Sequence, residues 1–403
     1  MGTVDQAATP NATLPLRVCV VGSGTRFLSG ISYYTMRLAN ALADQHQTSA
    51  ILMRQLLPGR FYPGRNRIGA NLTSQTYDPR VRVFDGVDWY WLPSILLAMV
   101  FLIRQRPNIV IFQWWTGTVL HSYLALALVA RLLGARLIVE FHEVQDTGEM
   151  RIPFARCYVN LLAPWLMRLA SGFVIHSEYD RPALEQRYTL GQRPVAVIPL
   201  GPFDHHRDMQ SDQVRREAPQ QCCNLLFFGV IRPFKGLEDL IEAFNSIPRE
   251  QIEQYWLTVV GETWEGWTLP AELIASSPYR DRITFVNRYI RDDEVSSFFV
   301  GADAVVLPYH RSSASGPVHT SMSWGLPLIT TRVGGLTEAV SQYEGAILVP
   351  PGDPSALCEA LTRVAVKRGI RYRDPHSWAN TCALFNRLFV QIGNGGSVAA
   401  YGD

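Results

Sequence analysis

The stretch NLLFFGVIRPFKGLEDLIEAF, residues 224–244, is the part of the sequence that says most about the fold. An apolar run is followed by a short turn that carries Arg232 and Lys235. From Leu237 to Phe244, apolar residues then recur with the i, i+3, i+4, i+7 spacing of an amphipathic helix. This order predicts a buried strand, a turn at its carboxyl end and a helix, which is the repeating unit of a parallel α/β sheet.

The same unit repeats on both sides of this stretch, because short apolar runs alternate with helical patterns along most of the chain. The polar segment 201–221 separates two such series. We therefore expect an α/β protein with two Rossmann-like, doubly wound parallel sheets facing a central cleft, where the ligands of such sheets bind. The predicted strands lie at 17–21, 108–112, 135–141, 172–176 and 195–199, and then at 224–229, 256–261, 282–286, 303–308, 327–330 and 345–350.

The length of 403 residues agrees with two domains of about 200 residues each. We predict a disordered tail at 1–15, a first α/β domain at 16–200, a linker at 201–221 and a second α/β domain at 222–373. A final helix at 374–392 is expected to pack across both domains, and 393–403 is expected to form a loose tail.

Composition excludes some classes of function. The 37 basic residues nearly balance the 35 acidic ones, so there is no basic surplus of the kind that nucleic-acid binding requires. The six cysteines form no metal-binding pattern, and reduced thiols in the cytoplasm are the default interpretation. The first fifteen residues contain no apolar signal core.

The most hydrophobic stretch, WYWLPSILLAMVFLI at 89–103, allows two interpretations. It is shorter than the roughly 20 residues that cross a bilayer, so it is not a spanning helix. It can be a buried or half-buried helix of the core. Alternatively, it is a surface helix that touches a membrane or a lipid acceptor, which would make the protein peripheral on the inner face of the plasma membrane.

Two cations three residues apart, at the cleft end of a strand, suit a diphosphate. The Arg232 guanidinium can bind a phosphate through two hydrogen bonds, and the Lys235 ammonium acts as a point charge. The alternative is a solvated loop with incidental charges.

The sequence resembles the family 4 retaining glycosyltransferases of the GT-B fold. GVIRPFKGLEDLIEAF resembles the signature that opens their second domain, and RSSASGPVHTSMSWGLPLITTRVGG at 311–335 resembles their second motif. Ser312 and Thr320 occupy the positions of the two glutamates of that motif, so both carboxylates are replaced. The positions that match the motif without a gap are Pro317, Met322, Gly325 and Pro327.

The resemblance implies transfer of a sugar from a nucleoside-diphosphate sugar, UDP- or GDP-linked, to a hydroxyl group, with retention and without a metal or other cofactor. Arg232 and Lys235 would stabilise the leaving diphosphate, and His142 would lie against the donor sugar. The other donor-binding candidates come from the motif at 311–335 and from the first βα turn: Gly30, Ser312, Ser315, Gly316, Pro317, Val318 and Thr320. The backbone amides at 315–318 open a helix, where an anion is favoured.

The acceptor side is less constrained by the sequence. Glu143 follows a predicted strand end, and Trp114 and Trp115 follow another, where they can stack on a sugar or pack in the core. The partner expected there is a carbohydrate, a lipid-linked molecule or a small molecule.

Two other functions stay open at this stage. One is a GT-B-like binding protein that lost catalysis together with the two glutamates. The other is a different nucleotide-sugar enzyme on the same fold, such as an epimerase. A dehydrogenase is disfavoured, because Phe27 stands where a dinucleotide fingerprint has its third glycine.

Overall fold

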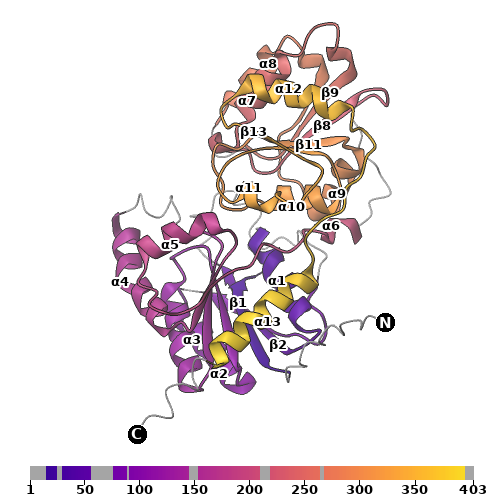
Figure 1. The fold of residues 1–403 in the computed structure, drawn as a ribbon. Coiled ribbons are helices and arrows are strands. Elements are labelled where there is room, and N and C mark those ends of the chain that lie inside the picture. Colours follow the sequence, from indigo (N-terminus) through magenta and orange to yellow (C-terminus); the bar gives the residue numbers. More distant parts are fainter. Residues whose placement is uncertain are drawn as a thin grey trace, which may run out of the picture.

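The computed structural model describes residues 15–24, 30–55, 76–88, 90–144, 153–208, 218–263 and 267–394, which form two α/β domains (Figure 1). Nearly all of the two predicted tails, Phe27, and residues 209–217 of the predicted linker lie outside these ranges.

The first domain is built on a fully parallel sheet with the order β3-β2-β1-β4-β5-β6-β7. Helices α2, α3 and α4 pack on one face, and α1 packs on the other together with the C-terminal helix α13. The strands are β1 (Arg17–Ser23), β2 (Gln47–Gln55), β3 (Arg82–Asp88), β4 (Ile109–Trp114), β5 (Arg136–Phe141), β6 (Gly172–Ile175) and β7 (Val195–Val197). The helices are α1 (Gly30–Leu42), α2 (Leu92–Gln105), α3 (Leu120–Leu132), α4 (Pro153–Leu169), η5 (Glu178–Asp180), α5 (Arg181–Arg187) and α13 (Trp378–Asn394).

The second domain repeats this design with the parallel order β10-β9-β8-β11-β12-β13. Helices α7, α8 and α12 cover one face, while α9, α10 and α11 cover the other. The strands are β8 (Cys223–Phe228), β9 (Tyr255–Val260), β10 (Ile283–Val286), β11 (Ala304–Leu307), β12 (Leu328–Thr331) and β13 (Ala346–Val349). The helices are α6 (His205–Asp208) before the domain, then η6 (Pro233–Lys235), α7 (Leu237–Asn245), η7 (Ile252–Gln254), α8 (Leu269–Ser276), η8 (Arg280–Arg282), α9 (Asp292–Gly301), α10 (Gly316–Ser323), α11 (Leu336–Ala339) and α12 (Pro354–Ala365).

The two doubly wound sheets confirm the predicted fold class, and every predicted strand is present. The sequence analysis missed β2 and β3. The edge strand β3 is exposed or half-buried over its first five residues, so it lacks the continuous apolar run that marks a buried parallel strand.

The chain returns to the first domain before α13. In the segment ahead of this helix, Tyr372 packs its ring 5.9 Å from that of Tyr343, and His376 lies 5.1 Å from His319, both in the second domain. The apolar residues of α13, such as Phe385, then join the core of the first domain. The crossing segment therefore contacts the second domain, and the helix packs on the first.

Among the described residues, no helix is both long and apolar enough to cross a membrane. The hydrophobic stretch at 89–103 largely forms α2, which buries one side against the first sheet and exposes the other.

Candidate active site in the cleft

The basic turn at the end of β8 is held by a close backbone approach. Gly236 has a φ of 66°, and a Cβ at this position would lie 1.9 Å from the carbonyl oxygen of Pro308, at the end of β11. Only glycine fits both the left-handed backbone and the contact. The turn that carries Arg232 and Lys235 therefore packs directly against the end of β11, a strand beside β8 in the sheet.

Lys235 has an environment that favours loss of its proton. Its Nζ lies 3.6 Å from the ring centroid of Tyr309, a residue that the sequence analysis did not single out. Burial lowers the pKa of Lys235 from 10.5 to about 7, and Arg232 adds to this, while the Glu143 carboxylate of the first domain acts in the opposite direction. The chain is rich in arginine and has two lysines, Lys235 and Lys367.

The same tyrosine joins this lysine to the start of α10. Ser315 is the N-cap residue of α10, and its Oγ donates a hydrogen bond of 3.3 Å to the Tyr309 hydroxyl. The amides of Gly316 and Val318 belong to the first turn of the helix, where N–H groups have no intrahelical partner and the dipole is positive. Pro317 occupies that turn without losing a helical hydrogen bond. Cationic side chains and helix amides thus share one corner of the cleft.

The two hydroxyls that replace the motif glutamates form local hydrogen bonds. Ser312 Oγ donates to the carbonyl of Ala314 at 2.8 Å, within its own loop. Thr320 is buried, and its Oγ1 donates to the carbonyl of Gly316 at 3.0 Å, one helical turn earlier. Both hydroxyl protons are used inside the loop, so these positions present weaker sugar-binding groups than carboxylates do.

Phe203, from the segment between the domains, brings two predicted donor-site glycines together. A Cβ on Gly30, the first residue of α1, would lie 3.5 Å from this ring, and one on Gly316 would lie 3.3 Å from it. The helix starts of both domains therefore meet across a single buried ring. Residue spacing gave no sign of this contact, because the three residues are far apart in the sequence.

His142 follows β5 and pairs with His176, which follows β6. Nδ1 of His176 contacts the carbonyl oxygen of Ile198 at 2.8 Å, and its Nε2 contacts His142 Nδ1 at 3.1 Å. Burial lowers the pKa of His176 to about 4 and holds that of His142 well below its usual value, with His176 adding to the effect on His142, so both rings are neutral.

With both rings neutral, the hydrogen bonds that connect Ile198, His176 and His142 have only one possible direction. A carbonyl accepts, so His176 carries its proton on Nδ1 and accepts at Nε2, which places the proton of His142 on Nδ1. The buried Nε2 of His142 has no hydrogen-bond partner among the described residues and is left as an acceptor. It can accept a hydrogen bond from a sugar hydroxyl. The sequence analysis named His142 but missed His176.

Glu140 lies beneath this pair, fully buried on β5. Its two carboxylate oxygens accept from the Tyr34 hydroxyl at 2.7 Å and from Gln113 Nε2 at 3.1 Å. Burial raises the pKa of Glu140 to about 7 against these hydrogen bonds. The ligand atoms of Glu140, His142 and His176 lie within 4.8 Å of one another, close enough to share a cation. Hydrogen bonds already account for both oxygens of the carboxylate.

His319 on α10 is a further cleft residue that the sequence analysis passed over. Its ring is buried, 6.0 Å from that of Phe203, and Nδ1 has no hydrogen-bond partner among the described residues. Burial holds the pKa of His319 well below its usual value, with smaller effects from His376 and His176.

Two candidates for the acceptor side lie in the core. Trp114 packs 5.9 Å from Phe141, Trp115 packs 6.5 Å from Tyr123, and both indoles are buried in the core of the first domain. This is the core alternative that the sequence left open, and such rings do not stack on an acceptor. Glu143 is exposed and remains a candidate.

A carboxylate of the second domain closes one end of the cleft. Glu338 on α11 accepts hydrogen bonds from the backbone N–H groups of Glu178 at 2.7 Å and Tyr179 at 2.8 Å, at the start of η5 in the first domain. These hydrogen bonds connect the segment after β6 in the first domain to α11 in the second domain.

Comparison with known proteins places this site in a family. A model described as "Glycosyl transferase 4-like domain" matches residues 29–201, and one described as "Glycosyl transferases group 1" matches residues 222–366. Together they include every strand of the two sheets except β1. The chain belongs to glycosyltransferase family 4. It is therefore a glycosyltransferase.

Curated relatives and solved structures agree with this assignment. A glycogen synthase of Mycobacterium tuberculosis is 25% identical over 84% of this chain and 82% of its own length. A D-inositol 3-phosphate glycosyltransferase of Salinispora arenicola is 26% identical over 58% of this chain and 56% of its own. The fold matches sucrose-phosphate synthase from Thermosynechococcus elongatus with a TM-score of 0.61 and 18% identity, covering 94% of this chain and 98% of that one. It matches Anabaena HepE in complex with UDP with a TM-score of 0.60 and 15% identity, covering 95% and 98%. These likenesses confirm the GT-B fold.

Proposed function

We propose that this glycosyltransferase moves a sugar from a UDP-sugar to a hydroxyl acceptor, with retention of the anomeric configuration and without a metal. The observation that carries the donor assignment is the corner built around Tyr309. There, the Lys235 ammonium lies over the ring of the buried Tyr309, the N-cap residue of α10 contacts the hydroxyl of the same side chain, and Arg232 stands in the same turn as Lys235. A nucleoside diphosphate has the charge and size for such a corner.

The chemistry follows from where negative charge develops. As the bond between the anomeric carbon and the diphosphate oxygen breaks, the leaving group gains charge, which Arg232, Lys235 and the first amides of α10 stabilise from fixed positions. The acceptor oxygen forms its bond to the same face of the anomeric carbon, and its proton passes to the leaving phosphate oxygen. His142 Nε2 accepts a hydrogen bond from a donor-sugar hydroxyl and so orients the ring.

UDP is proposed over GDP because several structural neighbours are described with it. HepE was solved with UDP and with UDP-glucose, and a trehalose-6-phosphate protein of Escherichia coli with UDP-2-fluoro glucose. For the location we propose the cytoplasm, which agrees with six cysteines that form no disulfide, and a peripheral contact with the membrane through α2.

Nucleotide release from a panel of UDP- and GDP-sugars tests the proposal, with and without EDTA. Lys235→Ala and Arg232→Ala are expected to lose turnover at least about 100-fold, the order seen when one charge-stabilising donor is removed from an active site. Lys367→Ala is the matched control, because Lys367 also lies over a tyrosine ring, 5.6 Å from that of Tyr372, at the end of α12.

Each result has a clear meaning. Unchanged turnover in EDTA supports the metal-independent mechanism, and loss of turnover that added metal restores would refute it. If no sugar nucleotide binds or reacts at micromolar enzyme, the transferase proposal fails. Tight binding without turnover would favour the second candidate, a GT-B-like binding protein. The local hydrogen bonds of Ser312 and Thr320 favour that candidate, because they leave only hydroxyl lone pairs for the donor sugar, which weakens the contact with the sugar while the diphosphate contacts remain.

A further inference from the structure

Helix α2 has an apolar stripe on each of its two sides. Ile95, Ala98 and Leu102 point into the core of the first domain, as expected for a helix that covers a sheet. Leu92 and Leu96 lie on the opposite side and are exposed, with Val100 and Ile103 continuing the same stripe. The solvent-facing side of a surface helix normally carries polar residues, so the exposed apolar stripe of α2 indicates a binding surface.

The next two helices extend this outer surface. On α3, Leu128 and Leu132 are exposed one turn apart, and Leu132 is 88% exposed. On α4, Phe154, Leu161 and Trp165 are exposed along one line of the helix. The three helices lie side by side on the same face of the first sheet (Figure 1). Most of the large hydrophobic side chains that are exposed among the described residues lie on or beside these helices, and we call this surface the apolar face.

The three helices of the apolar face carry basic side chains and no acidic ones. The sequence has no Asp or Glu at 89–139 or at 150–177, which include all three helices. The face carries exposed arginines at both ends and between its stripes, and Arg168 lies 4.9 Å above the ring of Trp165. These arginines are Arg104, Arg131, Arg156 and Arg168.

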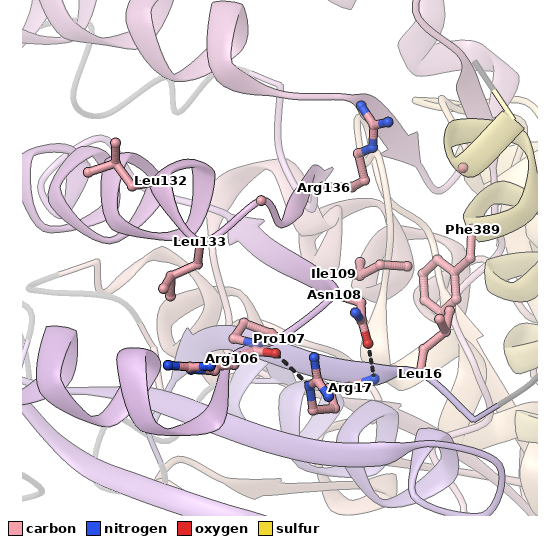
Figure 2. A pocket seen from close by; sticks show the side chains of 12 residues that line it. Leu16, Arg17, Arg106, Pro107, Asn108, Ile109, Leu132, Leu133, Arg136 and Phe389 are labelled. Carbon is pink, nitrogen blue, oxygen red and sulfur yellow. Dashed lines mark hydrogen bonds between the residues drawn. The ribbon is translucent and has the colours of Figure 1, made fainter. Parts of the chain in front are cut away.

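A cavity at the rim of the face is also basic. It has a volume of about 620 Å³ and lies where α2 and α3 end, at the edge of the first sheet opposite the cleft (Figure 2). Leu132 and Leu133 line one side, and Arg17, Arg106 and Arg136 are among the other lining residues. No lining residue is acidic. A phosphate group is the complementary ligand, since arginine binds it through paired hydrogen bonds.

We propose that the apolar face docks on an anionic phospholipid bilayer, with α2, α3 and α4 lying in the plane of the membrane and the arginine cavity holding a lipid phosphate. This deepens the peripheral contact put forward under the proposed function and rests on it. Apolar stripes flanked by arginine, tryptophan and no acid have the composition of helices that lie in a membrane interface. A second copy of this chain would bring arginines against arginines, so charge disfavours a dimer through the same surface.

The orientation also places the acceptor. His142 and Glu143 directly follow β5, and α4 is the next helix along the chain, beginning at Pro153. Phe154, at that end of α4, is strongly exposed on the apolar face. The helix that follows a parallel strand begins at the strand's carboxyl end, so the start of α4 lies at the cleft end of the sheet, and a hydroxyl carried by a lipid headgroup there would approach the acceptor side of the cleft. The acceptor class that this geometry favours is a membrane lipid.

Vesicle flotation tests the docking surface with the full chain. The probes are phosphatidylcholine vesicles and phosphatidylcholine vesicles that contain phosphatidylglycerol, at low and high salt. Wild type is expected to float with the anionic vesicles and at least about tenfold less with the neutral ones, since several arginines contribute. Leu96→Glu combined with Leu132→Glu is expected to lower vesicle binding by at least about tenfold, because both side chains leave the bilayer.

The control variant is Val366→Glu. Val366 is 86% exposed, close to the 88% of Leu132, and lies just after α12 in the second domain. The proposal is overturned if the double variant floats like wild type. It is also overturned if light scattering shows a wild-type dimer that the double variant turns into a monomer, since a second copy then covers the face. UDP binding measured without vesicles keeps the two proposals apart, because it tests the donor site alone.

Discussion

Raising the pH above 7 is expected to weaken UDP binding through the deprotonation of Lys235. In the free protein, burial and the Arg232 guanidinium lower the pKa of this ammonium from 10.5 to about 7. A bound diphosphate next to Nζ would stabilise the charged form and raise the pKa again. Binding above pH 7 therefore takes up a proton, and affinity falls as protons become scarce.

The size of the effect follows from the free-state pKa. With a pKa of about 7 when free and well above 9 when bound, the binding constant falls roughly 50-fold between pH 7 and pH 9, or about 2.3 kcal/mol. The last ionisation of a phosphate has a pKa of about 6, so it is nearly complete at pH 7 and contributes little to the change in affinity.

Isothermal titration with UDP at pH 7, 8 and 9 and constant ionic strength measures this dependence. Lys235→Met is expected to bind UDP weakly and with little dependence on pH, while Lys367→Met is expected to follow wild type. A wild-type affinity that stays constant between pH 7 and 9 would refute the reasoning, as would a Lys235→Met variant that keeps the full pH dependence.

The stability of the free protein provides a second readout. The folded-state pKa of Lys235 is depressed, so between pH 7 and 10.5 the unfolded chain binds the proton that the folded chain has lost. The contribution of this group to the free energy of unfolding therefore rises with pH by up to about 1.4 kcal/mol per unit. The difference between wild type and Lys235→Met in urea unfolding is expected to show this slope, and equal slopes would contradict the depressed pKa.

Three further substitutions test the donor loop and the domain contact. Gly316→Val is expected to lower UDP affinity at least about tenfold, because even a Cβ added here would lie 3.3 Å from the Phe203 ring and a branched side chain would displace the helix start. Gly393→Val is the control, since an added Cβ there would meet open space, and equal affinities in titration would contradict the contact. Ser312→Glu is expected to change the ranking of donor sugars in a nucleotide-release assay, since it restores a carboxylate that binds hydroxyls more strongly, and an unchanged ranking would count against a sugar contact at this position. Glu338→Ala is expected to lower the free energy of unfolding by about 1 kcal/mol and to increase the radius of gyration in X-ray scattering, because two exposed amides lose their acceptor. Glu338→Gln retains an oxygen and should lose less stability. Identical scattering for wild type and both variants would show that these hydrogen bonds do not hold the domains together.

The fold could be predicted because most strands of a doubly wound sheet are buried on both faces. A run such as that of β8 is apolar whatever its neighbours are, and the helix after it has its own period. The order of strands in each sheet was not readable in the same way. The edge strand β3, with Asp85 and Gly86 in its middle, escaped prediction because its burial depends on which strand lies beside it.

The parts of the candidate site that come from a single short segment of sequence could be predicted. Arg232 and Lys235 stand in one turn, and the amides of α10 come with the helix start itself. The roles of these residues in binding and catalysis stay predictions, and so do the domain boundaries.

Long-range contacts supplied the rest. The sequence shows a lysine after a strand, but the ring of Tyr309 under its ammonium, the pairing of His176 with His142, and the position of Phe203 between two helix starts come from segments far apart in the chain. The outer apolar stripe of α2 was visible as hydrophobicity, and only the packing of the helix showed which of its two sides faces solvent. The physical reason is one of range: backbone periodicity and strand burial leave a record in neighbouring residues, whereas desolvation of a charge and the choice of a histidine tautomer depend on atoms that folding brings together.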